Sequence, residues 1–452
     1  MASSATLATP NRWLIALAGV VVMICLGTAY SWSSFTQPLI ASFDWSNQIT
    51  TWAFAIAIFS LGWGAVIGGR WQDAVGPRTV TIVGVVLWGL GNLLAGLGTR
   101  HFGAPWLYLT YGVLGGIGNG MAYITPISTV TKWFPDKRGL AGGMVVMGFG
   151  LGAFFYGFIL KAIASFQTAS KHAGAFVDAH TAAIKAGTPF DPAQYALSSI
   201  DVSAVMHVFV FSGIAYAIVG GLCASLLSDP PAGYSVGGAV AAARSHEGSF
   251  TPTQVLRTPQ FYLLWTMLFL NVTAGILIVS NAVPIMRELT GVAAAIAVPA
   301  YGFVAIFNGL GRLFWGAISD RIGRNMAYVA IFAVQVVVFL TLAHLHSLGA
   351  VLVAFAIVLL CYGGGFGVMP SFNADYFGTK FLGVNYGMII TAWGFGGIVG
   401  PIVGARVKDA TGSFSGALVP VAIMLAIAAV LPFVTKPAKL ERLADASRGA
   451  AA

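Results

Sequence analysis

The chain has 452 residues, of which 58% are hydrophobic and only 8% are charged, and its mean hydropathy is +0.84. These values lie far outside the range of soluble domains, so the composition excludes a soluble protein and indicates one that crosses a membrane many times. The net charge of +9 could suggest a nucleic-acid partner. The basic residues, however, stand in short tracts between apolar segments and do not form one basic face, so we expect no nucleic acid to bind.

Apolar segments of about 20 residues, the length that crosses a hydrocarbon core of roughly 30 Å, recur along the whole chain. The first segment is too long for the core of a signal peptide, and we expect it to be retained as a helix. We predict an all-α membrane protein with twelve spans, near residues 13–40, 48–69, 79–98, 105–133, 139–165, 204–227, 259–286, 294–318, 326–345, 348–374, 383–406 and 415–434.

The positively charged residues indicate how these spans are oriented. Most of the 23 Lys and Arg residues fall in the termini and in the loops that follow the even-numbered spans. The positive-inside rule assigns such loops to the cytoplasm. We therefore predict a multi-pass protein of the cell membrane, the inner membrane in a bacterium, with both termini in the cytoplasm. In the long loop on the opposite side, near residues 166–203, we expect a surface helix.

A polar stretch rich in Gly, Ala and Ser separates the sixth predicted span from the seventh. It runs from 228 to 258 and contains the turn-forming sequence DPPAG. We interpret it as a cytoplasmic linker between two six-helix bundles, over residues 1–227 and 259–435. Residues 436–452 would form a cytoplasmic tail.

Two sequence similarities relate these halves to each other. The segment GRWQDAVGPR, which begins at Gly69, corresponds to GAISDRIGRN, which begins at Gly316, at an offset of 247 residues. The segment GMVVMGFGLG, which begins at Gly143, corresponds to GMIITAWGFG, which begins at Gly387, at an offset of 244 residues. Two offsets that agree within three residues predict a duplicated six-helix unit with internal pseudosymmetry.

Arg312 stands in the middle of the apolar segment FVAIFNGLGRLFWGAIS. An Arg at the centre of a membrane helix costs about 2.5 to 3.5 kcal/mol on insertion scales, and such residues usually mark a substrate or ion path. Asp320, the first charge of the next loop, is roughly 12 Å away along a helix, so the head group of Arg312 does not easily reach the interface. The alternative is a structural Arg held by backbone carbonyls or a neighbouring dipole. We predict that Arg312 binds an anion, and a planar carboxylate matches its guanidinium fork.

Asn308 precedes Arg312 by four residues and therefore shares its helix face. At an offset of 247 the first half has Leu61 and Ala65, so the polar pair occurs in one half only. A binding site that was added to a duplicated fold would show this asymmetry. Aromatic residues of other spans are candidates for the walls of this site, although a single ring is more often a packing residue. These candidates are Tyr30, Tyr123, Tyr362, Phe366 and Trp393.

The loops after the second and eighth spans share the pattern GxxxDxxG followed by Pro or Arg. This pattern resembles the loop signature of the major facilitator superfamily, and the span number, linker and repeat agree with that resemblance. A loop Asp can face a helix amino terminus or an Arg in one gate state and release it in the other; a plain loop cap is the alternative. The gating residues that we predict on this basis are Asp73, Arg78, Asp320, Arg321 and Arg324.

Three segments narrow the resemblance: NGLGRLFWGAISDRIGR, CYGGGFGVMPSFNADYFGTKFLGVNYG and GTAYSWSSF. They look like the oxalate/formate antiporter family, which is similar to the monocarboxylate transporters. The resemblance implies that Arg312 anchors a substrate carboxylate. It also implies a cavity lined as in bacterial lactate transporters of this type, by Asn308, Tyr123, Tyr362 and Phe366.

The chain departs from its relatives at two positions. Oxalate exchangers carry a Lys at about the place of Trp393, and its absence disfavours a dicarboxylate. Animal monocarboxylate carriers usually have Asp at the place of Asn308, so the obvious acid for proton coupling is missing. The acids nearest to the predicted spans are Asp375 and Glu288, and both are also plausible interface residues.

These observations predict a secondary active transporter of small monocarboxylates of lactate or pyruvate size, coupled to protons and working by alternating access. Exchange of organic anions of the oxalate/formate type is one alternative, and export of neutral or cationic solutes is another. No GxSxG, HExxH or Walker sequence occurs, so we expect no enzyme, no catalytic residue, no cofactor and no metal. The expected partners are a small carboxylate, a proton and the lipid bilayer, and the resemblance implies a monomer.

Overall fold

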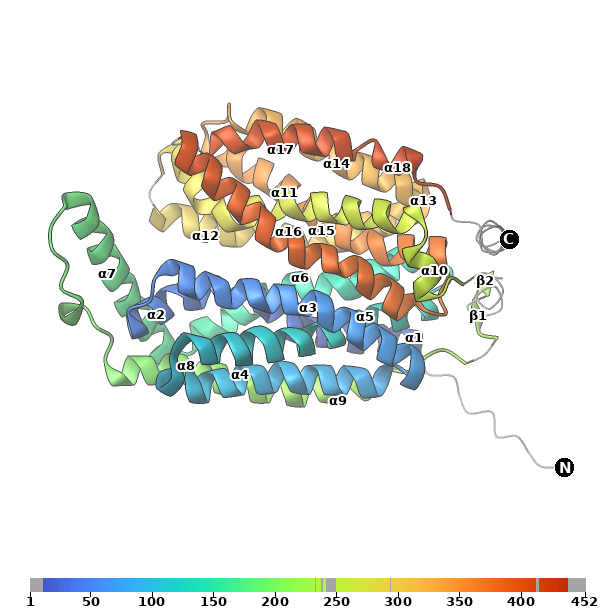
Figure 1. Ribbon diagram of the computed structural model, residues 1–452, viewed down its shortest axis with the longest axis horizontal. Helices are drawn as coiled ribbons and strands as arrows, with labels where there is room; N and C mark the ends of the chain where they lie inside the picture. Colours follow the sequence, from blue (N-terminus) through green and yellow to red (C-terminus); the bar gives the residue numbers. More distant parts are fainter. Residues whose placement is uncertain are drawn as a thin grey trace, which may run out of the picture.

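The computed structural model describes residues 11–231, 233–236, 239–240, 249–292, 294–411 and 414–437. The predicted linker over 228–258 and tail over 436–452 therefore lie partly outside the described residues. The amino-terminal helices form one side of the molecule and the carboxy-terminal helices form the other (Figure 1).

The amino-terminal half consists of α1 (Arg12–Gly27), η1 (Thr28–Trp32), α2 (Ser33–Phe43), α3 (Asn47–Val75), α4 (Pro77–Leu107), η2 (Tyr108–Gly115), α5 (Gly116–Trp133), α6 (Arg138–Ala162), α7 (Ala164–Ala186), η3 (Pro192–Gln194), α8 (Ser199–Ala215), η4 (Tyr216–Gly220) and α9 (Gly221–Ala224). Two short strands, β1 (Ser235–Val236) and β2 (Ala239–Val240), pair antiparallel after it. The carboxy-terminal half consists of α10 (Pro252–Leu256), α11 (Pro259–Thr290), α12 (Ala294–Val304), α13 (Ile306–Ile322), α14 (Arg324–Leu342), α15 (Leu348–Phe377), α16 (Leu382–Thr411), α17 (Ser415–Ala428) and α18 (Leu431–Val434).

Ten helical segments of the described chain are long and apolar enough to cross a membrane. One of them, Pro77–Trp133, has 57 residues and contains two crossings, because a bilayer needs only about 20 residues. Gly103 adopts a positive φ of 69° between these two crossings. A further crossing is formed by α12 and α13, which are each too short to be counted alone. With these two additions the helices account for the twelve predicted spans.

Several of the predicted spans are not continuous helices; the twelfth, for example, is split between α17 and α18. The first is interrupted by the 3-10 turn η1, and the eighth is interrupted at Ala305, between α12 and α13. The turn η1 carries Trp32, whose indole nitrogen donates a hydrogen bond of 3.1 Å to the carbonyl of Thr50 in α3. Hydropathy along the chain gives no sign of these breaks.

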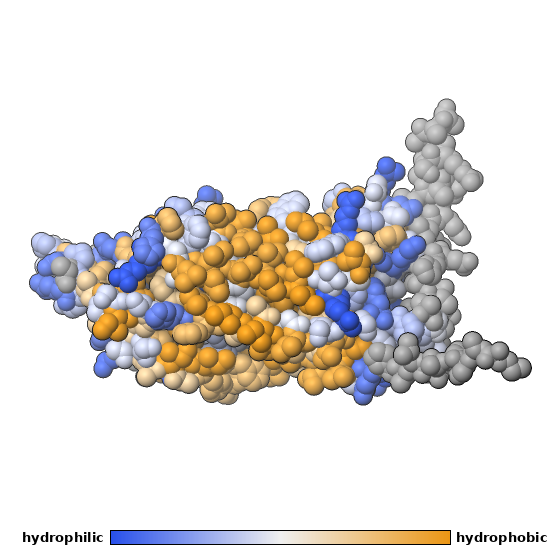
Figure 2. All heavy atoms as spheres, turned by 90° about the horizontal axis from the view of Figure 1, so that it is seen from below, coloured by the Kyte–Doolittle hydropathy of each residue, from blue (hydrophilic) through white to orange (hydrophobic). Residues whose placement is uncertain are grey.

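Apolar side chains form a broad band between polar ends on the face shown in Figure 2. Large apolar side chains that are more than half exposed are spread over the helices of both halves, for example Leu97, Phe158, Phe211 and Val337. Their exposure is what a helix bundle surrounded by lipid requires.

The two ends of the bundle differ. Helix α1 begins and α18 ends at one of them, which we call the near end, and the carboxy-terminal ends of α3 and α13 also lie there (Figure 1). The far end carries α2, α7 and α12. Helix α7 is the surface helix predicted in the long loop, and a small apolar cluster that includes Ala173 and Phe176 packs it against Ala41 of α2.

The most extensive contacts between the halves are those of α3 with α16 and of α6 with α13; α15 also contacts α6, and α16 contacts α5. The backbones of the first two pairs touch at glycines: a Cβ atom at Gly69 would lie 2.2 Å from the carbonyl oxygen of Gly383, and one at Gly316 would lie 2.4 Å from that of Gly139. Small residues permit such an approach. The glycine-rich character of these spans therefore reflects direct contact between the halves.

Candidate functional site

Arg312 lies in α13 at the interface between the halves, and its side chain is 0% exposed. Its Nη1 donates to the carbonyl oxygen of Val146 in α6 at 3.2 Å, and its Nε donates to Oδ1 of Asn308 at 3.4 Å. Its Nη2 has no hydrogen-bond partner among the described residues. Backbone and amide contacts thus satisfy only part of the guanidinium. A buried cation that is incompletely paired is costly. The N–H groups of Nη2 therefore call for an acceptor that the described side chains and backbone do not supply.

Aromatic rings surround the guanidinium. Its central carbon lies 4.9 Å from the ring centre of Phe366 and 5.5 Å from that of Phe149, which are distances typical of cation–π contacts. Trp393 is at the centre of the cluster. Its ring lies 4.9 Å from Phe366, 5.3 Å from Phe149, 5.6 Å from Tyr123 and 5.9 Å from Tyr30. The rings come from both halves, so both contribute to the walls of the site.

Three hydroxyl groups lie in the same cluster. Those of Tyr30 and Tyr362 are 3.2 Å apart and hydrogen-bonded. Those of Tyr30 and Tyr123 lie beside the Arg312 guanidinium. Within the described part of the chain, the Tyr123 hydroxyl and the Trp393 Nε1 have no hydrogen-bond partner. The cluster therefore contains three kinds of donor that lack an acceptor, which suits an anionic ligand.

The structure gathers all seven predicted binding residues into this one cluster. Sequence reasoning missed Phe149 and the carbonyl of Val146, which reach Arg312 from the other half. Phe149 lies in the repeat segment GMVVMGFGLG and corresponds to Trp393 at the offset of 244 residues, so the repeat could have pointed to it. The binding roles of these residues stay predictions: Arg312, Asn308, Tyr30, Tyr123, Tyr362, Phe366 and Trp393.

The sequence and the fold also resemble those of known proteins. Residues 17–401 match the model of the Major Facilitator Superfamily. The chain belongs to this superfamily. Within it, the chain is 30% identical to the oxalate:formate antiporter of Oxalobacter formigenes over 400 residues, which is 88% of this chain and 85% of the relative. This similarity supports membership of the oxalate/formate antiporter family.

Two further proteins extend the comparison. The apicoplast pyruvate carrier 1 of Toxoplasma gondii is 25% identical to this facilitator, over 84% of this chain and 81% of the carrier. The crystal structure of the fucose:proton symporter of E. coli superimposes with a TM-score of 0.65 at 16% identity, over 95% of this chain and 100% of that one. At such a low sequence identity, the superposition shows only that the two proteins share a fold.

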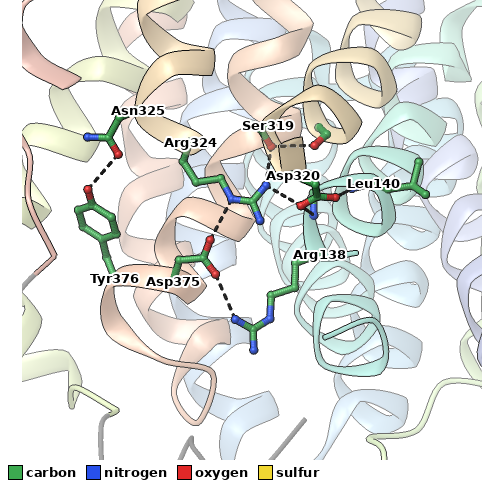
Figure 3. A network of polar contacts seen from close by, with 10 residues as sticks. Arg138, Leu140, Ser319, Asp320, Arg324, Asn325, Asp375 and Tyr376 are labelled. Atoms are coloured by element: carbon green, nitrogen blue, oxygen red, sulfur yellow. Dashed lines mark hydrogen bonds and ion pairs between the residues drawn. The ribbon is translucent and has the colours of Figure 1, made fainter. Parts of the chain in front are cut away.

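Asp320 ties the halves of the facilitator together at the near end. It stands at the end of α13, and its carboxylate accepts hydrogen bonds from the backbone N–H groups of Gly139 at 2.9 Å and Leu140 at 2.8 Å (Figure 3). These groups belong to the first turn of α6, where a helix favours negative charge. Arg324 pairs with the same carboxylate at 2.7 Å. The predicted contact of this Asp with a helix terminus and an Arg is present.

Asp375 of α15 extends this network. It accepts from Nε of Arg324 at 2.9 Å and pairs with Arg138 of α6 at 3.1 Å (Figure 3). The acid that the sequence offered as a proton site therefore lies in an ion-pair network at the near end. Sequence reasoning missed Arg138, because 237 residues separate it from its partner and nothing local relates the two.

Asp73 makes the corresponding contact from the amino-terminal half to the carboxy-terminal half. It stands at the end of α3 and accepts a hydrogen bond of 3.1 Å from the backbone N–H of Val384, in the first turn of α16. Arg78 and Arg321 do not take part in the near-end contacts: both side chains are exposed, and neither forms an ion pair with any described residue. The gating roles of all five predicted residues stay predictions.

Proposed function

We propose that this chain is a carrier of small monocarboxylates, of lactate or pyruvate size, that transports them together with a proton by alternating access. The observation that carries the proposal is the buried Nη2 of Arg312, which lacks an acceptor in the described structure and lies among rings of both halves. Further support comes from relatives named for oxalate and formate exchange and for pyruvate transport.

In this proposal the carboxylate supplies the missing acceptors. One oxygen binds Nη2 of Arg312 and the other accepts from the hydroxyl of Tyr123, while Asn308 keeps the guanidinium oriented through its contact with Nε. Phe366 and Trp393 pack against the short carbon chain. One cation at the site balances one negative charge, and the indole of Trp393 adds none, so a monoanion fits better than a dianion.

Alternating access then consists of a rocking motion of residues 1–227 against residues 259–435, with the stretch 228–258 as a linker. Asp73, Asp320 and Arg324 would hold the near end closed in one state, together with Arg138 and Asp375, and release it in the other. Arg78 and Arg321 would contact this network only in another state. We assign the near end, and with it both termini and the tail, to the cytoplasm, and we propose a monomer as the working unit.

Anion exchange is the second candidate. The observation that supports it is the lack of a carboxylate partner for Arg312 in the described structure. No carboxylate among the described side chains pairs with Arg312, so an empty carrier must reorient with an unbalanced buried charge. The two acids considered for proton coupling are engaged elsewhere. Asp375 lies in the near-end network, and Glu288 accepts from the backbone N–H of Phe414 at 3.1 Å. Exchange avoids the empty step, because an anion occupies Arg312 in both directions.

Uptake of labelled lactate into proteoliposomes tests both candidates. The purified protein and its Arg312→Ala variant are compared with an inward proton gradient, with and without oxalate inside. We expect gradient-driven uptake by the native protein and loss of at least about 90% of it in the variant, since the carboxylate loses its only charged anchor. Leu313→Ala, which shortens the neighbouring side chain, is the matched control and retains uptake.

The outcomes separate the candidates. Uptake that occurs only against internal oxalate would establish exchange in place of symport. Carboxylate uptake by Arg312→Ala at the native rate, or no carboxylate flux in the native protein, would contradict the proposed function.

A further inference from the structure

A second group of unpaired polar side chains lies between the Arg312 cluster and the near end. Asn373 in α15 is 0% exposed, and neither atom of its amide has a hydrogen-bond partner among the described residues. Tyr386 in α16 is also 0% exposed. Its hydroxyl lies near that of Tyr123, yet neither oxygen is hydrogen-bonded within the described structure.

The positions of Asn373 and Tyr386 along their helices show where they lie relative to the Arg312 cluster. Asn373 follows Phe366 by seven residues, and Tyr386 precedes Trp393 by seven. Seven residues are two helical turns, or roughly 10 Å, and return to the same helix face. Helix α15 ends at the near end and α16 begins there. The backbones at both positions therefore lie one layer nearer to the near end than the aromatic walls, and the Tyr386 side chain reaches back to the hydroxyl of Tyr123.

The neighbouring contacts place this layer at the interface between the halves. A Cβ atom built on Gly142 of α6 would lie 3.7 Å from Oγ of Ser371, which is two residues before Asn373. On the other side of the layer, Tyr386 lies near Tyr123 of α5. Residues of both halves thus border it, as they border Arg312.

The unpaired amide of Asn373 is an exception in this protein. The other buried asparagines of the described chain each use at least one amide atom in a hydrogen bond: Asn92, Asn119, Asn271, Asn308 and Asn385. Buried polar groups are nearly always paired, and an unpaired one calls for a specific explanation. A ligand that binds beside Asn373 in another state of the carrier would explain the unpaired amide.

We propose that Asn373 and Tyr386 form a second binding step for the substrate, between Arg312 and the near end. The inference rests on the proposed function, because the ligand is the same small monocarboxylate. The hydroxyl of Tyr386, which lies beside that of Tyr123, donates to the carboxylate as it leaves the guanidinium, and the amide of Asn373 donates to it next. Neutral donors hold an anion less tightly than a charged fork does, so the step guides the substrate outwards without trapping it.

Two variants remove the donors with little change in shape, Asn373→Leu and Tyr386→Phe. Lactate exchange by proteoliposomes and lactate binding to the purified protein are measured for both. We expect the exchange turnover to fall about tenfold, the loss that one hydrogen bond to a charged group implies, while the dissociation constant of lactate changes less than about twofold. The melting temperature is not lowered, because the removed groups have no partner in the closed protein.

Tyr328→Phe is the matched control. It removes a buried hydroxyl of the same helix bundle that does have a partner, the carbonyl oxygen of Gly365 at 2.7 Å. We expect this variant to lower the melting temperature and to leave the turnover per folded molecule unchanged. Turnover within about twofold of the native value in both test variants, beside this control, would overturn the proposal. A parallel loss of binding and turnover would also overturn it, since the step would then not be separate from Arg312.

Thiol accessibility provides an independent measurement. Asn373→Cys is made in a protein whose native cysteines, Cys25, Cys223 and Cys361, are replaced by Ser. A water-soluble maleimide applied from the near side should label it, and lactate should slow the labelling. Gln335→Cys, at a fully buried position inside the carboxy-terminal half, should stay unlabelled. Equal resistance of both cysteines would contradict the inference, whereas native transport by Arg312→Ala would contradict only the proposed function on which it rests.

Discussion

Tyr30 and Tyr362 stand 332 residues apart in the chain, and one hydrogen bond of 3.2 Å joins their hydroxyl oxygens. The first belongs to the 3-10 turn that interrupts the first span, and the second belongs to α15. The bond therefore connects the halves beside Arg312. Since its two partners come from different halves, it has to break when the halves separate at this point.

Tyr30→Phe should weaken the closed state around the substrate. Removal of one such hydrogen bond costs about 1 kcal/mol, or about fivefold in an equilibrium. We expect the KM of lactate exchange to rise about fivefold. The control is Tyr156→Phe, which removes a hydroxyl bonded to Ser212 within the amino-terminal half and should leave the KM unchanged. Equal KM values in all three proteins would show that the bond does not contribute to closure.

Arg312→Lys should impair transport although the charge is kept. Lysine offers a point charge and cannot reproduce the planar fork, which bonds Asn308 and Val146 and presents Nη2. We expect kcat/KM for lactate exchange to fall at least about tenfold. Full activity of this variant in proteoliposomes would argue against a two-pronged contact with the carboxylate.

Asp375→Asn should favour opening of the near end, because it removes the carboxylate that bridges Arg138 and Arg324. The pairs are partly exposed, so we expect a shift of about threefold in the population that is open at this end, reduced further by salt. Distances between spin labels at Lys137 and Ile322, measured by electron paramagnetic resonance, report this population. Asp229→Asn breaks the pair with Lys132 instead and should leave the distances unchanged. A closed population as large as in the native protein would contradict the prediction.

Gly316→Ala should prevent closure of the near end. The added Cβ would lie 2.4 Å from the carbonyl oxygen of Gly139, a separation that forces α6 and α13 apart. We expect lactate exchange to fall at least about tenfold while each half remains folded. Gly302→Ala is the control, because a Cβ there meets no atom within 4 Å. Native exchange rates in Gly316→Ala would mean that the helices accommodate a methyl group between them.

Much of the fold follows from local properties of the sequence. Hydropathy gives the spans, and the repeat gives the two halves, because each crossing must be apolar over a similar length whatever its neighbours are. The neighbourhood of Arg312 and Asn308 was predictable for the same kind of reason: four residues apart on a helix means one face. The aromatic candidates converge on them because few positions in a lipid-exposed bundle face its interior.

The remaining features depend on contacts between distant segments. Phe149 meets Arg312 only because α6 crosses α13 at glycines, and Arg138 meets Asp375 only when both halves are in place. The breaks at Thr28 and Ala305 are not marked by hydropathy, and the first lies beside a tertiary contact, the hydrogen bond from Trp32 to Thr50. The repeat marks Phe149 as the counterpart of Trp393, but no pattern within one segment encodes which distant residues either ring contacts.

The contacts of Asp73 and Asp320 are reciprocal. Each half lends a carboxylate to the first turn of a helix in the other: Asp73 to Val384, and Asp320 to Gly139 and Leu140. The halves can therefore diverge in substrate preference, provided that each keeps its acid and its receiving helix start. A chimaera that joins residues 1–240 of this chain to the second half of a related carrier should close at this end only if that half retains an acid at position 320 and a free backbone N–H at position 384. The contacts that close the near end therefore need residues from both halves, and neither half can form them alone.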